Sequence, residues 1–133
     1  MTMADDPTCP CGSASPLAAC CGVHLAGIPA PTPEALMRSR YTAFARGDAR
    51  YLEQTWHPGT RPEHLDLEPD LRWTGLEIVA AEAGPKRGTV EFRAHWTDGR
   101  TWGVLHERSR FVRQSDRWWY LDGVIDPEVT SAR

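Results

Sequence analysis

The chain has 133 residues, 41% of them hydrophobic and 25% charged, which predicts a folded protein with one sizeable core. The net charge of −3 gives no general attraction to nucleic acid or to an anionic membrane. No apolar run approaches the roughly 18 residues of a membrane span, and residues 1–19 lack the basic start and apolar stretch of a signal peptide. We therefore expect a cytoplasmic protein without a nucleic-acid or membrane partner.

All the cysteines cluster near the N-terminus, as Cys9, Cys11, Cys20 and Cys21, so disulfides cannot hold the whole chain together. Four thiolates from two short turns can surround one Zn²⁺ ion tetrahedrally. The alternative is two disulfides, which adjacent and near-adjacent cysteines would strain and which the reducing cytoplasm disfavours. We predict a closed, structural zinc site, in which His24 could replace Cys21 as the fourth ligand.

Two helices are predicted after the cysteines. Thr32 is a candidate N-cap and Gly47 a typical helix stop, which together predict a helix over 33–46. Asp48 can cap a second, shorter helix over 49–56.

The hydrophobic period then changes from that of a helix to two, which indicates β-strands. Four antiparallel strands are predicted, over about 72–82, 90–97, 101–114 and 117–125. The last strand is apolar on both faces, so we expect it to be covered on both sides, by the helices and by a second copy of the chain in a homodimer.

Several motifs resemble a known family. Cys-Pro-Cys-Gly-Ser-Ala at 9–14 and Cys-Cys-Gly at 20–22 resemble the SEC-C zinc motif found at the C-terminus of the SecA translocation ATPase. The stretches 36–44, 51–58, 107–113 and 118–123 resemble the YchJ-like family of bacterial proteins. That family pairs an N-terminal SEC-C motif with a domain similar to nuclear transport factor 2, a cone-shaped, cystatin-like α+β roll. The resemblance covers about residues 9–125 and implies a fold and a metal, but no reaction, because the family is uncharacterised.

On this basis the chain divides into a SEC-C segment (1–25), a linker (26–32), an α+β roll (33–128) and a tail (129–133). The roll should pack N-terminal helices on a curved antiparallel sheet. We expect a protein-interaction or small-ligand-binding module rather than an enzyme, with the zinc knuckle presenting a rigid surface to a protein partner.

Arg40 lies in the middle of the apolar stripe of the first predicted helix. A buried guanidinium cannot lose its charge and needs a carboxylate partner. Glu107 shares one face of the third strand with the apolar residues Leu105 and Phe111. We therefore predict an ion pair between Arg40 and Glu107. The alternative is that Arg40 anchors an anionic ligand in a pocket.

The mouth of such a roll often holds a ligand, as the resemblance implies. The residues expected there are Arg40, Tyr41, Trp56, His57, Arg61 and Trp96. His57 could act as an acid or base, with Glu107 or Asp122 as its orienting carboxylate, in an enzyme of the dehydratase, isomerase or hydrolase type. The other interpretation of His57 is a surface or capping histidine.

Overall fold

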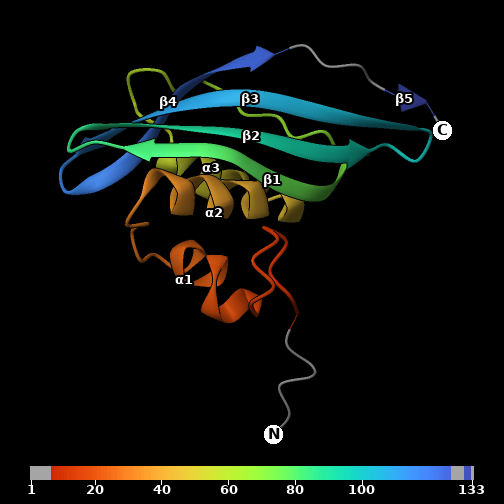
Figure 1. Ribbon diagram of the computed structural model, residues 1–133, viewed down its shortest axis with the longest axis horizontal. Helices are drawn as coiled ribbons and strands as arrows, with labels where there is room; N and C mark the ends of the chain where they lie inside the picture. Colours follow the sequence, from red (N-terminus) through yellow and green to blue (C-terminus); the bar gives the residue numbers. More distant parts are fainter. Residues whose placement is uncertain (1–6, 127–130, 133) are drawn as a thin grey trace, which may run out of the picture.

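A computed structural model describes residues 7–126 and the backbone of residues 131–132. The segments 1–25, 33–128 and 129–133 assigned from the sequence therefore lie partly outside the described residues. Within these residues, three helices and a short 3₁₀ turn precede five strands (Figure 1). In chain order they are η2 (Leu17–Ala19), α1 (Cys21–Leu25), α2 (Pro33–Arg46), α3 (Ala49–Thr55), β1 (Arg72–Ala83), β2 (Arg87–Thr97), β3 (Thr101–Gln114), β4 (Arg117–Asp126) and β5 (Ser131–Ala132).

The boundaries of α2 and α3 follow from their capping residues. The Thr32 side chain accepts a hydrogen bond from the backbone N–H of Ala35, which satisfies a donor that the first turn of α2 leaves free. Gly47 ends α2 in the left-handed conformation, with φ 72°. The Asp48 side chain accepts from the N–H of Tyr51 and begins α3. The predicted α2 is confirmed at both ends, and α3 ends one residue before its predicted end.

The four predicted strands are confirmed as an antiparallel sheet in the order β1-β2-β3-β4, and β5 pairs with the start of β3. Strand alternation decides which face each side chain takes. In β2 the buried residues Val90, Phe92 and Ala94 alternate with residues that stay partly exposed. In the pairing of β3 with β4 the register shifts between Arg110 and Phe111, which is a β-bulge.

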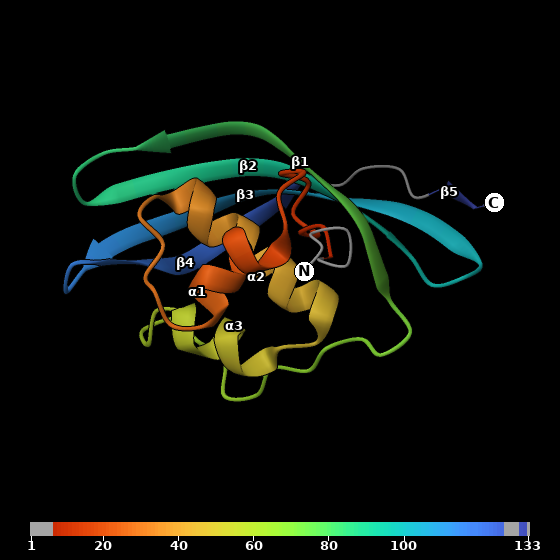
Figure 2. The same cartoon turned by 90° about the horizontal axis from the view of Figure 1, so that it is seen from below.

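The molecule has three layers. The curved sheet covers α2 and α3, and α1 lies on the side of α2 that faces away from the sheet (Figures 1 and 2). The predicted α+β roll, with helices packed on a curved antiparallel sheet, is confirmed. No helix in the described residues is long and apolar enough to cross a membrane.

The cysteine segment shares the core of the roll. Cys9, Cys11 and Cys21 are buried in the same hydrophobic cluster as Leu36 of α2 and Phe92 of β2. The sequence predicted a zinc knuckle joined to the roll by a linker and presenting a rigid surface to a protein partner. The contacts add that the knuckle packs on the roll as a third layer, and the partner stays a prediction.

The helical layer does not cover the end of β4. Val124 is 68% exposed and Ile125 is 60% exposed among the described residues, and the expected cover of this strand by a second copy of the chain stays a prediction. The helical layer reaches β4 near its start, where Trp56 bridges to Tyr120 and the His57 N–H donates to the Tyr120 carbonyl. Alternating apolar residues show that a strand could be covered, but not how far along it the helices extend.

Candidate metal centre and ligand cavity

The four cysteine sulfurs converge on one point. Their Sγ atoms all lie within 4.8 Å of one another, and those of Cys11 and Cys20 are 3.6 Å apart. Tetrahedral zinc, with bonds of about 2.3 Å, requires sulfurs about 3.8 Å apart. All four cysteines are free, so the alternative of two disulfides is not what the structure shows. The donor set and its spacing fit one tetrahedral metal ion.

Two short turns present the sulfurs. The loop that carries Cys9 is closed by a 2.8 Å hydrogen bond from its backbone N–H to the Ser15 carbonyl. Gly12 continues the loop with φ 88°, a conformation that glycine adopts without strain. The second pair of cysteines lies where η2 ends and α1 begins. Gly22 follows that pair, and a Cβ there would lie 2.6 Å from the Leu17 carbonyl oxygen, so the turn has no room for a side chain.

The surroundings change the pKa of the cysteine thiols in different directions. Burial raises the pKa of the Cys9 thiol, but hydrogen bonds from the backbone of Cys11 and Cys21 to its sulfur help lower that pKa to about 7. Burial raises the pKa of Cys21 above its ordinary value. A divalent cation among the sulfurs would offset the cost of ionising the buried thiols, because a metal ion is the largest local charge in such a site.

His24 lies outside this cluster of sulfurs. Its Nδ1 is 2.9 Å from the Ile28 carbonyl oxygen, within the turn that follows α1. The group of side chains close enough to share a metal in the described residues consists of the four cysteines, with Cys21 and without His24.

Side chains of α2 fix the metal-binding segment to the roll. Arg38 donates from Nη1 to the Cys11 carbonyl at 2.8 Å, and its Nε pairs with Glu34 at 3.0 Å. The Cys9 Sγ lies 3.7 Å from the Thr42 hydroxyl, in the buried interface. The conformation of the cysteine turns and the position of α2 therefore depend on each other.

A second feature is a cavity of about 200 Å³ between α2 and the sheet. Its wall is mainly apolar and aromatic, with side chains from α2, β1, β2 and β3. Its polar wall residues include Arg40, Glu107, Ser109 and Tyr120. Small-molecule sites have this composition, with many apolar side chains and a few converging polar groups.

Three of the residues predicted for the pocket line this cavity, namely Arg40, Tyr41 and Trp56, and three do not, namely His57, Arg61 and Trp96. Arg61 donates to the Trp56 backbone carbonyl outside the cavity. The Trp96 ring packs where a Cβ on Gly103 would otherwise lie. Periodicity predicted the face of each side chain but could not distinguish a cavity wall from the rest of that face.

Arg40 is only 2% exposed, as its place in the apolar stripe predicts. Its Nη1 donates to the Leu52 carbonyl at 2.8 Å and to the Thr55 hydroxyl at 2.7 Å. Its guanidinium carbon lies 4.3 Å from the centre of the Tyr120 ring and 5.2 Å from that of Trp56. Burial lowers the pKa of Arg40 to about 10, so the guanidinium keeps its charge at neutral pH.

The predicted ion pair between Arg40 and Glu107 is wrong. Glu107 instead accepts hydrogen bonds from the Ser109 hydroxyl at 2.7 Å and the Tyr120 hydroxyl at 3.1 Å. The Tyr120 ring contacts Arg40 with its face and Glu107 with its hydroxyl, so it connects the two charged groups. A Cβ at Gly123 would overlap the Glu107 carboxylate, so this glycine provides the space that Glu107 occupies.

The predicted catalytic candidates do not converge. The His57 Nε2 lies 2.9 Å from the Gln114 Oε1, and the His57 Nδ1 accepts a hydrogen bond from the Gly59 N–H at 3.0 Å. Both contacts lie at the start of an exposed loop. Asp122 pairs with Arg110 at 2.6 Å in an exposed contact, and only Glu107 lines the cavity. The arrangement of His57 with an orienting carboxylate is therefore not observed.

Tyr120 and Ser109 are site residues that the sequence prediction missed. Burial, followed by the charge of Glu107, raises the pKa of Tyr120, so its hydroxyl stays protonated and donates. The bulge after Arg110 pairs Phe111 with Tyr120 and leaves Leu121 between the pairs. Strict alternation cannot place a bulge. Ser109 lies two residues from Glu107 on the same face of β3, and this spacing was the sequence signal that could have identified it as a site residue.

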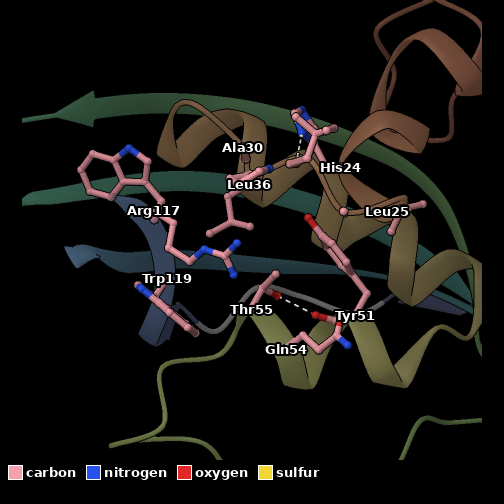
Figure 3. Close-up of a pocket in the computed structure, with 13 residues that line it drawn as sticks. His24, Leu25, Ala30, Leu36, Tyr51, Gln54, Thr55, Arg117 and Trp119 are labelled. Carbon is pink, nitrogen blue, oxygen red and sulfur yellow. Dashed lines mark hydrogen bonds between the residues drawn. The ribbon is translucent and has the colours of Figure 1, made fainter. Parts of the chain in front are cut away.

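A smaller hollow of about 100 Å³ lies between the linker, α3 and β4. Figure 3 shows Arg117 and Trp119 on its β4 side, with Thr55, Gln54 and Tyr51 from α3 opposite. The exposed Arg117 guanidinium packs over the Trp119 ring, 5.6 Å from its centre. This hollow is half the size of the cavity and does not contain its buried charges.

The comparison with known families agrees with the fold and the cysteine cluster. Residues 32–123 match the family described as the YchJ middle NTF2-like domain. The chain belongs to the YchJ-like family. A UPF0225 protein from Streptomyces coelicolor is 54% identical over 121 residues, covering 88% of this chain and 94% of that protein. Another, from Chromobacterium violaceum, is 50% identical over 125 residues, covering 88% and 92%.

Two solved structures with a similar fold are described as SEC-C motif containing proteins. A SEC-C motif containing protein from Rhodopseudomonas palustris has a TM-score of 0.81 and 34% identity, covering 91% of this chain and all of that one. A SEC-C motif containing protein from Psychrobacter arcticus has a TM-score of 0.68 and 30% identity, covering 92% and 84%. The resemblance identified from the sequence motifs is confirmed.

Proposed function

We propose that this protein binds a compact organic molecule in the cavity between α2 and the sheet. In this proposal a zinc ion held by Cys9, Cys11, Cys20 and Cys21 is structural, and keeps the helical layer in place over that cavity. Four thiolate ligands leave no open coordination position, which is typical of structural zinc. Free thiols in this arrangement suit a reducing compartment such as the cytoplasm.

The observation that carries the proposal is the cavity itself. Protein interiors are close-packed, and a well-packed core contains few voids larger than a water molecule. A hollow of about 200 Å³ that is partly open to solvent and reaches the buried Arg40 is therefore space that the core side chains leave unfilled. A cavity of about 150 Å³ already accommodates benzene, so this one can hold a single ring with a substituent.

Filling the cavity tests the proposal. We expect Ala94→Leu to abolish binding of single-ring compounds, because Ala94 is buried in the cavity wall and the larger side chain would occupy the space. The thermal midpoint should stay the same or rise, because the added methyl groups fill a void. A library of anionic, neutral and cationic single-ring compounds, screened by ligand-observed NMR, gives the readout. Ligands of about ten non-hydrogen atoms should bind with dissociation constants on the order of 1 mM.

Ala80→Leu is the matched control, since Ala80 is exposed on β1 of the same sheet and does not line the cavity. It should bind the same compounds as the natural protein. A library without binders, or binders that Ala94→Leu retains, would contradict the proposed function.

A further inference from the structure

The cavity wall contains a buried cation that no carboxylate contacts. Both hydrogen bonds of Arg40 come from Nη1 and go to neutral oxygens of Leu52 and Thr55. Its other contacts are the faces of the Trp56 and Tyr120 rings. Nε and Nη2 of Arg40 make no hydrogen bond to the described residues, and neither is a fully buried donor, so both can be reached from the cavity that Arg40 lines. Removing a cation from water without an anionic partner is costly, and an anion arriving at the cavity would reduce that cost.

We infer that the ligand is a compact apolar monoanion, such as a single-ring carboxylate, whose charged group pairs with Arg40 while its ring lies against the apolar wall. This inference rests on the proposed function, because it names the chemistry of the molecule that the cavity binds. A carboxylate matches the planar donor geometry of a guanidinium, and such charge-assisted hydrogen bonds are among the strong ones.

The apolar wall of the cavity determines the chemistry of the uncharged part of the ligand. Its wall includes Phe44, Trp73, Phe92 and Leu105, from α2 and three strands, which suits a flat hydrocarbon ring. Trp56 also lines the cavity, and its Nε1–H is buried without a partner among the described residues. A ligand oxygen that reached it would satisfy that donor.

Glu107 limits the ligand to a single negative charge. Its Oε2 already accepts two hydroxyl hydrogen bonds, from Ser109 and Tyr120, and therefore stays in place on the sheet side of the cavity. The Tyr120 ring lies between this carboxylate and Arg40. A negative group of the ligand is attracted to Arg40. A second negative group at the other end of the ligand would be repelled by Glu107.

Three single-ring probes of similar size distinguish the possible charges of the ligand: benzoate, benzyl alcohol and benzylammonium. Isothermal titration calorimetry on the full metal-loaded chain should give the lowest dissociation constant for benzoate. Benzoate should bind about tenfold or more tightly than benzylammonium, since only benzoate can pair with Arg40.

Two substitutions should change benzoate affinity in opposite directions. Arg40→Met removes the cation and should weaken benzoate binding about tenfold or more. Glu107→Gln keeps an oxygen for the Ser109 and Tyr120 hydroxyls but removes the negative charge, so it should tighten binding about threefold to tenfold. Benzyl alcohol should respond little to either change. Arg113→Met, at an exposed position of β3, is the matched arginine control and should leave benzoate binding unchanged.

The outcomes separate the two proposals. Tightest binding of benzyl alcohol or benzylammonium, or a Glu107→Gln chain that binds benzoate no better, would overturn the anionic ligand and leave the binding cavity standing. Failure of all three probes to bind would contradict the cavity as a ligand site as well. Circular dichroism identifies a variant that does not fold. If Arg40→Met does not fold, the comparison of the three probes and the Glu107→Gln variant still test whether the ligand is an anion.

Discussion

Replacing Cys11 with serine is expected to destabilise the whole domain rather than only its N-terminal turns. Cys11 is fully buried, lies in the same cluster as residues of α2 and β2, and its carbonyl accepts from Arg38. Loss of a structural metal removes binding free energy that also stabilises the fold. We expect a loss of at least about 3 kcal/mol in the free energy of unfolding, which for a domain of this size lowers the thermal midpoint by roughly 10 °C.

Elemental analysis and thermal unfolding under reducing conditions measure this effect. The natural chain should carry one zinc per molecule and Cys11→Ser less than one. His24→Ala is the matched control, because His24 lies beside the cluster but hydrogen bonds to Ile28, and it should keep one zinc. A Cys11→Ser chain that loses zinc but keeps its thermal midpoint would show that the cysteine segment folds independently of the roll, against this account.

Truncating Phe111 to alanine should be the most damaging change within the roll itself. The side chain is 1% exposed and its ring packs edge-on against Tyr120, with 5.7 Å between the ring centres. Removing a buried phenylalanine leaves a void, and the expected cost is about 3–5 kcal/mol of unfolding free energy. Chemical denaturation followed by tryptophan fluorescence gives the value.

Phe111→Ala should also weaken ligand binding, because Tyr120 would lose the ring that supports it beside the cavity. Val124→Ala is the control for hydrophobic truncation in the same sheet. Val124 is 68% exposed, so its loss should cost no more than about 0.5 kcal/mol. Equal costs for the two substitutions would mean that the core is not centred on Phe111.

Local chemistry explains why the helices and strands could be predicted from the sequence. The cap at Thr32 and the left-handed Gly47 are interactions between residues a few positions apart, so α2 has the predicted ends. The alternation that predicted the strands is equally local. The cysteine cluster could be recognised because zinc coordination restricts both the residue type and the spacing.

The parts that could not be predicted depend on contacts between distant segments. Arg40 was correctly expected to be buried, but its partner is determined by how α3 brings Leu52 and Thr55 to it. The bulge in the β3–β4 pairing brings Tyr120 between Arg40 and Glu107, and nothing in the period of β4 indicates it. The same limit applies to His57, whose partly exposed position outside the cavity follows from the path of the loop after α3.

The most direct test of the central claim is the set of tryptophan indole N–H resonances in a ¹⁵N–¹H NMR spectrum of the zinc-loaded chain during titration with benzoate. Trp56 and Trp73 line the cavity, whereas Trp102 is 44% exposed and lies outside it. We predict a saturable shift of the Trp56 and Trp73 signals, largest for Trp56, with Trp102 unchanged. Shifts confined to Trp102, or none that saturate, would contradict a ligand site in the cavity.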